Sequence, residues 1–178
     1  MNIAVYCAAS QSNCPAFDTK TEELGKWMAK HKHTLVYGGG NTGLMGVVAT
    51  AVMNEGGEVI GVMPQFFVDR EIAKQDITKL HIVDTMSERK NQMIALSEVY
   101  IALPGGPGTL EEIAEVVSWV RVGQTNGICI FYNMEGYYDH LEAFFDKMVE
   151  ASLLSEEDRS QIHFAKSLSE IEAIVGLL

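Results

Sequence analysis

TLVYGGGNTGLMG, at residues 34–46, joins a short apolar run to a glycine-rich turn and then to a helix-forming segment. Its glycines have the spacing G-x-G-x-x-G between a strand and a helix, an arrangement that lets backbone amides at a helix start approach a phosphate. A dinucleotide site would also need an acidic residue at the end of the next strand, and GVMP at residues 61–64 supplies none. We therefore expect the loop either to bind a single phosphate, through Gly39 and Gly40, or to pack the helix closely against the sheet.

The alternation of strand and helix continues along the whole chain. The predicted strands are short, continuous apolar runs at residues 3–7, 34–37, 59–63, 80–83, 99–103, 128–132 and 162–164. The predicted helices cover residues 16–30, 42–55, 87–97, 109–121, 138–151 and 169–174. Continuous apolar runs are typical of strands covered on both faces, and this alternation favours right-handed βαβ units. We expect an α/β, Rossmann-like three-layer fold with a mostly parallel central sheet, forming a single domain over residues 1–178.

In open sheets of this kind, ligands bind beyond the carboxyl ends of the strands. The candidate walls of a site are therefore the loops that follow Cys7, Tyr37, Met63 and Leu103.

The composition limits the possible partners. The chain has 24 Asp+Glu against 13 Lys+Arg, for a net charge of −11. A duplex-binding protein normally presents a basic face, so we expect no nucleic-acid partner. An anionic ligand would have to be held locally, by helix N-termini and a few cations.

Other residue patterns indicate the setting of the protein. The three cysteines form no CxxC pair, which favours a reducing, cytoplasmic location. We expect no signal peptide, because the first residues, MNIAVYCAAS, have no basic region followed by a long apolar stretch. We expect no membrane span, because no apolar run reaches about 18 residues. The five histidines have no metal-ligand spacing, so no metal site is expected.

A second glycine loop, PGGPGTLEE at residues 104–112, follows an apolar run. Its glycines would offer backbone amides to an anion, through Gly105, Gly106 and Gly108. Thr109 and Glu112 have the spacing of a capping box, which would make Glu112 structural. The alternative is a carboxylate beside a phosphate-binding mouth, able to stabilise an oxocarbenium ion or to activate water.

TMSERK at residues 85–90 opens another predicted helix. Thr85 and Glu88 have the spacing of a capping box. Arg89 and Lys90 are either a surface cation pair or an anion grip, since arginine can donate two parallel hydrogen bonds to a phosphate or carboxylate.

Three segments together resemble the signature of the LOG family, which is named for plant cytokinin-activating enzymes and whose bacterial members were once labelled lysine decarboxylases. They are YGGGNTGLMG at residues 37–46, MSERK at 86–90 and PGGPGTLEE at 104–112. Flanking segments match as well, so that the resemblance covers nearly the whole chain: EVIGVMPQF at 58–66, REI at 70–72 and EGYYDHLEAFFDKMVE at 135–150.

The resemblance implies a homodimer with its site near the dimer interface and no metal or organic cofactor. It implies hydrolysis of the N-glycosidic bond of nucleoside 5′-monophosphates, AMP and/or cytokinin riboside 5′-monophosphates, to free base and ribose 5-phosphate. The catalytic pair falls on Arg89 and Glu112. Phosphate-binding and other substrate positions fall on Gly106, Gly108, Thr109, Lys90, Glu71 and Ser118. Pro107, at the variable position of the glycine loop, leaves the preferred base open.

A non-catalytic nucleotide carrier or sensor is the main alternative, because Rossmann-like folds host many functions. The intact Arg89 and Glu112 favour the hydrolase. A pyridoxal-phosphate decarboxylase would need a Schiff-base lysine in a larger cofactor fold, and Lys90 has no such context. Apolar side chains of the predicted helix 109–121 that the core leaves exposed would suit a dimer face.

Overall fold

The computed structural model describes residues 1–69 and 73–177. Within them the strands are β1 (Asn2–Tyr6), β2 (Thr34–Tyr37), β3 (Val59–Pro64), β4 (Lys79–Val83), β5 (Val99–Ala102), β6 (Ile128–Tyr132) and β7 (Ile162–Ala165). The helices are α1 (Pro15–Lys30), α2 (Gly43–Asn54), α3 (Gln65–Val68), α4 (Met86–Ala95), α5 (Pro107–Arg121), α6 (Asp139–Glu150), α7 (Glu156–Ser160) and α8 (Leu168–Val175), with a 3₁₀ turn η1 (Met134–Gly136).

The strands form one sheet in the order β4-β3-β2-β1-β5-β6-β7, and every pair of neighbours is parallel. The chain moves outward from β1 to β4 and then returns to place β5 on the other side of β1. The strand order therefore reverses between β1 and β5, where open α/β sheets have their ligand crevice. The predicted Rossmann-like fold is confirmed.

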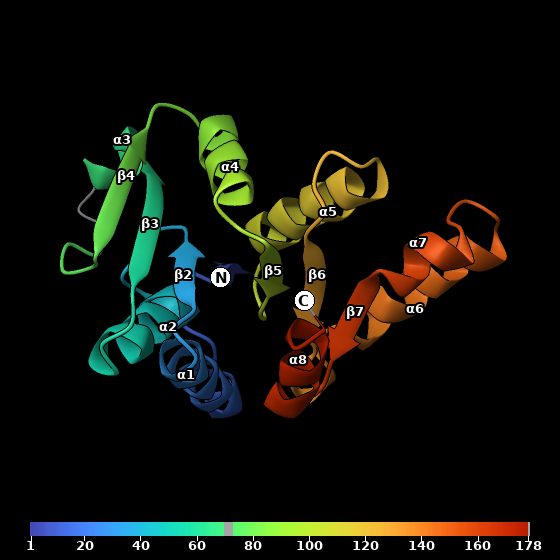
Figure 1. Ribbon diagram of the computed structural model, residues 1–178, viewed down its shortest axis with the longest axis horizontal. Coiled ribbons are helices and arrows are strands. Elements are labelled where there is room, and N and C mark those ends of the chain that lie inside the picture. The colour runs from blue at the N-terminus through green and yellow to red at the C-terminus, as the bar shows by residue number, and fades with distance from the viewer. Residues whose placement is uncertain (70–72, 178) are drawn as a thin grey trace.

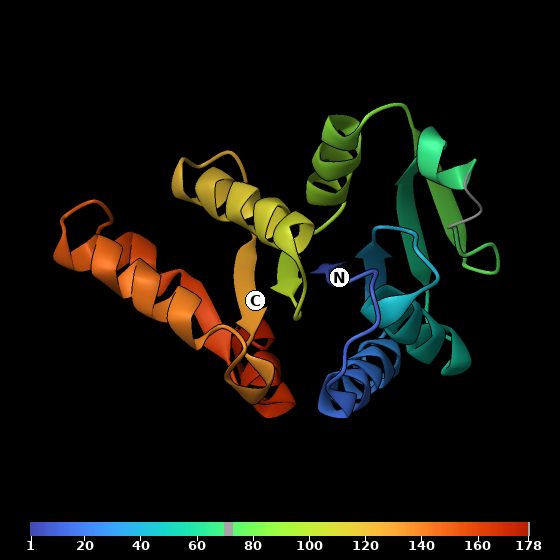
Figure 2. The ribbon, with the colours of Figure 1, turned by 180° about the vertical axis from the view of Figure 1, so that it is seen from behind.

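Helices cover both faces of the sheet and make three layers (Figures 1 and 2). One core lies between the sheet and α1, α2 and α8, and the other between the sheet and α4, α5 and α6. Alternate side chains of β1 supply the two cores, with Ile3 and Val5 in the first and Ala4 and Tyr6 in the second. This two-sided burial explains why the strands have continuous apolar sequences. Among the described residues, no helix combines the length and apolar character needed to cross a bilayer.

Two helix starts bear on the site. Thr85 caps α4, accepting a hydrogen bond from the Glu88 backbone N–H at 3.1 Å, which confirms the predicted cap. The predicted cap at Thr109 is wrong, because α5 begins earlier, at Pro107, with Gly106 as its N-cap. Proline suits the first turn because its φ is already helical and it needs no N–H partner there. Thr109 is therefore buried within the first turn of α5.

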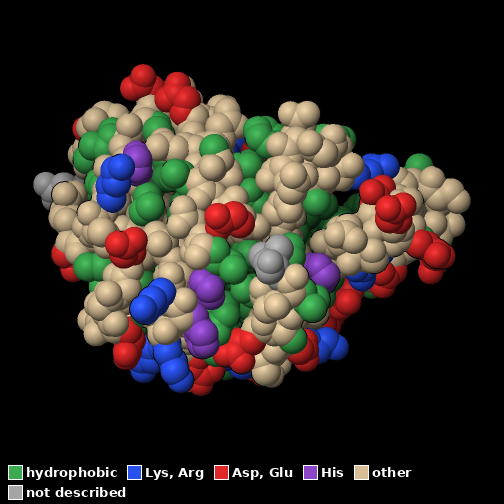
Figure 3. Space-filling model, viewed as in Figure 1, with side chains coloured by type: hydrophobic (Ala, Val, Ile, Leu, Met, Phe, Trp, Pro, Cys, Tyr) green, Lys and Arg blue, Asp and Glu red, His purple; other side chains and the backbone are tan. Residues whose placement is uncertain are grey.

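The sequence patterns also missed the short helix α7. Ser155 caps it, and Arg159 joins it to α6 through an ion pair with Asp146 at 2.7 Å. Basic and acidic side chains are interspersed on the lobe that α6 and α7 form at the right of Figure 3.

Candidate functional site

A cavity of about 330 Å³ opens beyond the carboxyl ends of β1 and β5, at the point where the strand order reverses. Its walls come from the loop after β1, the start of α5, one side chain of α2 and two of α4. The lining residues are Cys7, Ala8, Ala9, Ser10, Met45, Met86, Arg89, Gly106, Gly108, Thr109, Glu111 and Glu112. Of the predicted walls, the loops after Cys7 and Leu103 are thus present.

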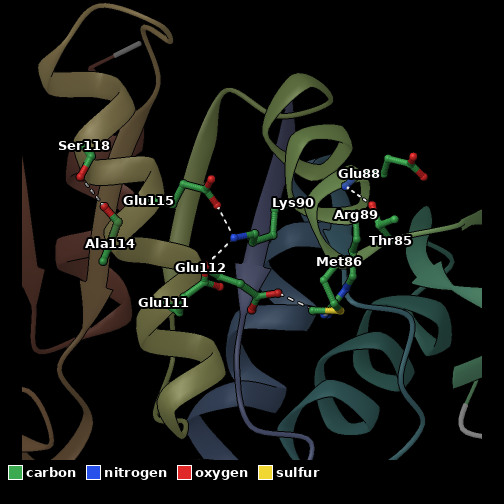
Figure 4. Close-up of polar contacts among 10 residues, drawn as sticks. All are labelled: Thr85, Met86, Glu88, Arg89, Lys90, Glu111, Glu112, Ala114, Glu115 and Ser118. Atoms are coloured by element: carbon green, nitrogen blue, oxygen red, sulfur yellow. Dashed lines mark hydrogen bonds and ion pairs between the residues drawn. The ribbon is translucent and has the colours of Figure 1, made fainter. Parts of the chain in front are cut away.

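Arg89 of α4 and Glu112 of α5 point toward one another across the cavity wall (Figure 4). Their Nη1 and Oε1 atoms are 3.2 Å apart, and the side chains are only 7% and 6% exposed. Arg89 Nε also donates a hydrogen bond to the carbonyl oxygen of Val62 in β3, at 3.1 Å. Burying two charges costs several kcal/mol per ion, which attraction offsets only in good geometry. A buried pair that faces a cavity is therefore better explained by function than by stability.

The electrostatic setting of Glu112 suits acid–base chemistry. Burial raises the pKa of its carboxyl group, and the adjacent Arg89 charge acts in the opposite direction. The contact with Arg89 lacks hydrogen-bond geometry, so Oε1 has no hydrogen-bond partner among the described residues. Unpartnered buried acceptors are rare and are costly to keep. The Arg89 charge, 3.2 Å away, is what offsets this cost at Oε1.

Lys90 is engaged between two helices rather than directed into the cavity. Its ammonium forms ion pairs with Glu111 and with Glu115 of α5, the latter at 2.8 Å (Figure 4). The hydrogen bond to Glu111 is the largest cause of its raised pKa. Lys90 is absent from the cavity lining, and its predicted phosphate contact stays a prediction. The adjacent residues Arg89 and Lys90 therefore each link α4 to α5 through an ion pair.

The glycine loop before α5 presents open backbone to the cavity. A Cβ atom built on Gly106 or Gly108 would meet nothing within 4 Å, and both residues line the cavity. Gly105 is different, because an added Cβ there would overlap the hydroxyl of Thr109. Backbone amides at a helix start carry partial positive charge. The first turn of α5 thus has the form of an anion site.

Two tyrosines donate hydrogen bonds to the backbone of this loop. The Tyr137 hydroxyl donates to the carbonyl oxygen of Gly105, and the Tyr138 hydroxyl donates to that of Leu103, both at 2.6 Å. A carbonyl and the N–H of the next residue point in opposite directions because the peptide unit is planar and trans. The bond from Tyr137 therefore directs the Gly106 N–H away from the tyrosine. Both tyrosines lie in a segment that carries the family resemblance, but no sequence motif predicted that they contact the glycine loop.

The first glycine loop lies outside the cavity lining. Gly39 has φ +80°, and its carbonyl oxygen accepts a hydrogen bond from the Lys74 N–H. Gly40 forms an isolated antiparallel bridge with Ala73. Phosphate binding by Gly39 and Gly40 stays a prediction. Both contacts join the loop to the segment that precedes β4.

Ser118, another predicted substrate residue, is not brought to the cavity. Ser118 donates a hydrogen bond to the carbonyl oxygen of Ala114, one turn earlier in its own helix, at 2.9 Å (Figure 4). Glu71 lies outside the described residues. Over the described ranges, no three or more His, Cys, Asp or Glu side chains are grouped so that they could hold a metal ion. Sequence reasoning missed Met45 and Met86, which line the cavity as ordinary helix residues.

Similarity to known proteins is extensive. Residues 45–174 match the model of a protein family described as "Possible lysine decarboxylase". The chain is 40% identical over 169 residues to a cytokinin riboside 5′-monophosphate phosphoribohydrolase of Arabidopsis thaliana, covering 95% of this chain and 79% of the relative. It is 40% identical over 169 residues to a probable enzyme of the same name from Oryza sativa subsp. japonica, covering 95% and 68%.

Solved structures with this fold include the molybdenum cofactor carrier protein of Chlamydomonas reinhardtii. Its TM-score is 0.74 at 23% identity, with 99% of this chain and 96% of that chain covered. Such low identity establishes the shared fold alone. The sequence relatives are decisive for the family: the chain belongs to the LOG family, whose curated members are named cytokinin riboside 5′-monophosphate phosphoribohydrolases.

Proposed function

We propose that this protein hydrolyses the N-glycosidic bond of nucleoside 5′-monophosphates, AMP and/or cytokinin riboside 5′-monophosphates, to free base and ribose 5-phosphate. The observation that carries the proposal is the buried Arg89–Glu112 ion pair on the wall of a cavity that also exposes the glycine amides of α5. A phosphorylated ribose needs both features, an anion site for the phosphate and a carboxylate beside C1′. The names of the sequence relatives support the same reaction.

The 5′-phosphate binds at the first turn of α5, where Gly106 and Gly108 leave the backbone open and the Thr109 side chain adjoins them. Helix N-termini bind anions in this way because several N–H groups lack partners there. This local anion site resolves the apparent conflict between an anionic substrate and a chain of net charge −11.

Glu112 then acts on the ribose. The bond from C1′ to the base breaks, its electron pair leaves with the base, and positive charge develops on the sugar. The Glu112 carboxylate stabilises this charge and receives a proton as water adds to C1′. The departing base takes up one proton from solvent, and Glu112 afterwards releases to solvent the proton it received from water, so the protons balance and the carboxylate is regenerated. Arg89 favours the ionised form of Glu112 and so opposes the larger effect of burial, which raises the pKa of this carboxyl group.

The test is chromatographic analysis of purified protein incubated with AMP, GMP, CMP or isopentenyladenosine 5′-monophosphate. We expect a free base and ribose 5-phosphate from at least one nucleotide, and no release by Arg89→Ala. Binding of the nucleotides without any release would overturn the hydrolase and leave the non-catalytic carrier or sensor.

We further propose that two copies associate through the surface of α4 and α5, with the site near the interface. Exposed apolar side chains support this: Met86 is 37% exposed, Leu110 45% and Val122 67%. Light scattering should give the mass of a dimer for the wild type and of a monomer for Leu110→Glu. A wild-type monomer would contradict the assembly.

Two smaller proposals concern the setting. The free cysteines Cys7, Cys14 and Cys129 support a cytoplasmic location. One sheet covered on both faces supports a single domain over residues 1–178. The partner is a small nucleotide, and neither nucleic acid nor a membrane has a part in the proposal.

A further inference from the structure

Gly38 follows β2 and lies against the guanidinium of Arg89. A Cβ atom built on Gly38 would overlap Nη2 of Arg89 and lie 3.0 Å from its Cζ. The guanidinium therefore occupies the space that any side chain at this position would fill. The Gly38 backbone is not left-handed, unlike that of Gly39 at φ +80° and Gly43 at φ +59°. Space, and not backbone conformation, is what requires glycine at position 38.

Arg89 is not free to yield to such a side chain. Its Nε donates to the Val62 carbonyl oxygen at 3.1 Å, and its Nη1 lies 3.2 Å from Glu112 Oε1. The side chain is 7% exposed, so other positions would require rearrangement of its packing. Movement away from Gly38 would stretch one or both of these contacts.

We propose that Gly38 is a positioning residue for the reaction, because its bare α-carbon provides the space that holds the Arg89 guanidinium against Glu112. The role in catalysis rests on the proposed function. The contact itself does not, and it can be tested without any substrate. The inference gives the first glycine of the G-x-G-x-x-G pattern a purpose other than binding a phosphate.

The first test is a cycle of melting temperatures for the wild type, Gly38→Ala, Arg89→Ala and the double variant. Gly38→Ala should lower the melting temperature in the wild type, because its methyl group and the guanidinium overlap. In the Arg89→Ala background the same change should leave the melting temperature unchanged or raise it, since alanine restricts the unfolded chain more than glycine. An equal loss in both backgrounds would overturn the proposed contact. This cycle decides the contact even if the protein proves to have no hydrolase activity.

The second test separates positioning from general loss of structure. Gly38→Ala should lower kcat/KM about 100-fold, the typical effect of misplacing a catalytic group by about 1 Å. The acidic limb of its pH–rate profile should also move to higher pH, because Glu112 loses part of the Arg89 charge that opposes its raised pKa. The other ionisable groups around Glu112 are unchanged by the substitution, namely Tyr6 and Cys7 of the first strand segment, Lys90 of α4, and Glu111 and Glu115 of α5.

Gly57→Ala is the matched control. Its added Cβ would lie 2.7 Å from Val52 Cγ1 and 2.8 Å from Ala29 Cβ. Gly57 precedes β3 and so lies at the edge of the sheet opposite the cavity. Gly57→Ala should lose stability and keep the wild-type acidic limb. If Gly38→Ala also kept that limb while losing activity, the positioning role would be overturned.

Discussion

Replacing Glu112 by glutamine should slow hydrolysis about a thousandfold while leaving the fold intact. Glutamine has nearly the same shape, so the change removes a negative charge and a proton acceptor with little effect on packing. Glu112 is buried, and at an effective dielectric constant of about 20 two unit charges about 4 Å apart attract by about 4 kcal/mol. Losing that attraction to the developing positive charge at C1′ corresponds to about three powers of ten in rate.

The assay is steady-state release of the base, with Glu115→Gln as the matched control. Glu115 lies one turn later on α5, pairs with Lys90 and is absent from the cavity lining. We expect Glu112→Gln to lower kcat with little change in KM, because the phosphate site is untouched. Glu115→Gln should remain within a few-fold of the wild type. If Glu112→Gln kept about a tenth or more of the wild-type kcat, the electrostatic reasoning would be refuted.

Three further predictions follow from burial and hydrogen bonding. Because burial raises the pKa of Glu112, the acidic limb of the kcat/KM profile should have its midpoint above pH 4.5. Activity should fall as lower pH protonates the carboxylate. A pH–rate profile with its midpoint at or below pH 4.5 would contradict the role of Glu112. Tyr138→Phe should lower the free energy of unfolding by about 1–3 kcal/mol in urea denaturation, because the buried carbonyl oxygen of Leu103 loses its donor, and unchanged stability would count against this bond. Partial alkylation followed by mass spectrometry should find Cys14 modified before Cys7, whose pKa burial raises, whereas equal labelling would contradict the buried cavity wall.

Most of the sheet is predictable from sequence because each strand is a continuous apolar run ended by a turn. The runs at 34–37 and 128–132 match β2 and β6 at both ends. Short polar elements such as α7 are not predictable in this way, because α7 has no apolar run and none of its residues is buried. Local propensity contributes little to so short a helix, and tertiary contacts decide it.

The candidate site, too, could be predicted from the sequence only in part. Local sequence placed the glycine loop of α5 at a strand end, since that follows from the βα order. The pairing of Arg89 with Glu112 came from the family resemblance, because their distance depends on how α4 and α5 meet after the chain returns to β5. Lys90 was expected near the phosphate, but the two carboxylates it meets on α5 could be identified only from the folded arrangement. Nothing in the sequence around Gly38 predicted that the Arg89 guanidinium would lie beside it.

The most direct test of the central claim compares AMP with adenosine as substrates for the purified wild-type protein, with the products separated by chromatography. The account predicts adenine and ribose 5-phosphate from AMP and far slower release of adenine from adenosine, because only AMP carries the phosphate that the first turn of α5 would hold. Equal rates of adenine release from the two substrates would contradict the phosphate site, and no release of adenine from AMP would contradict the hydrolysis of AMP.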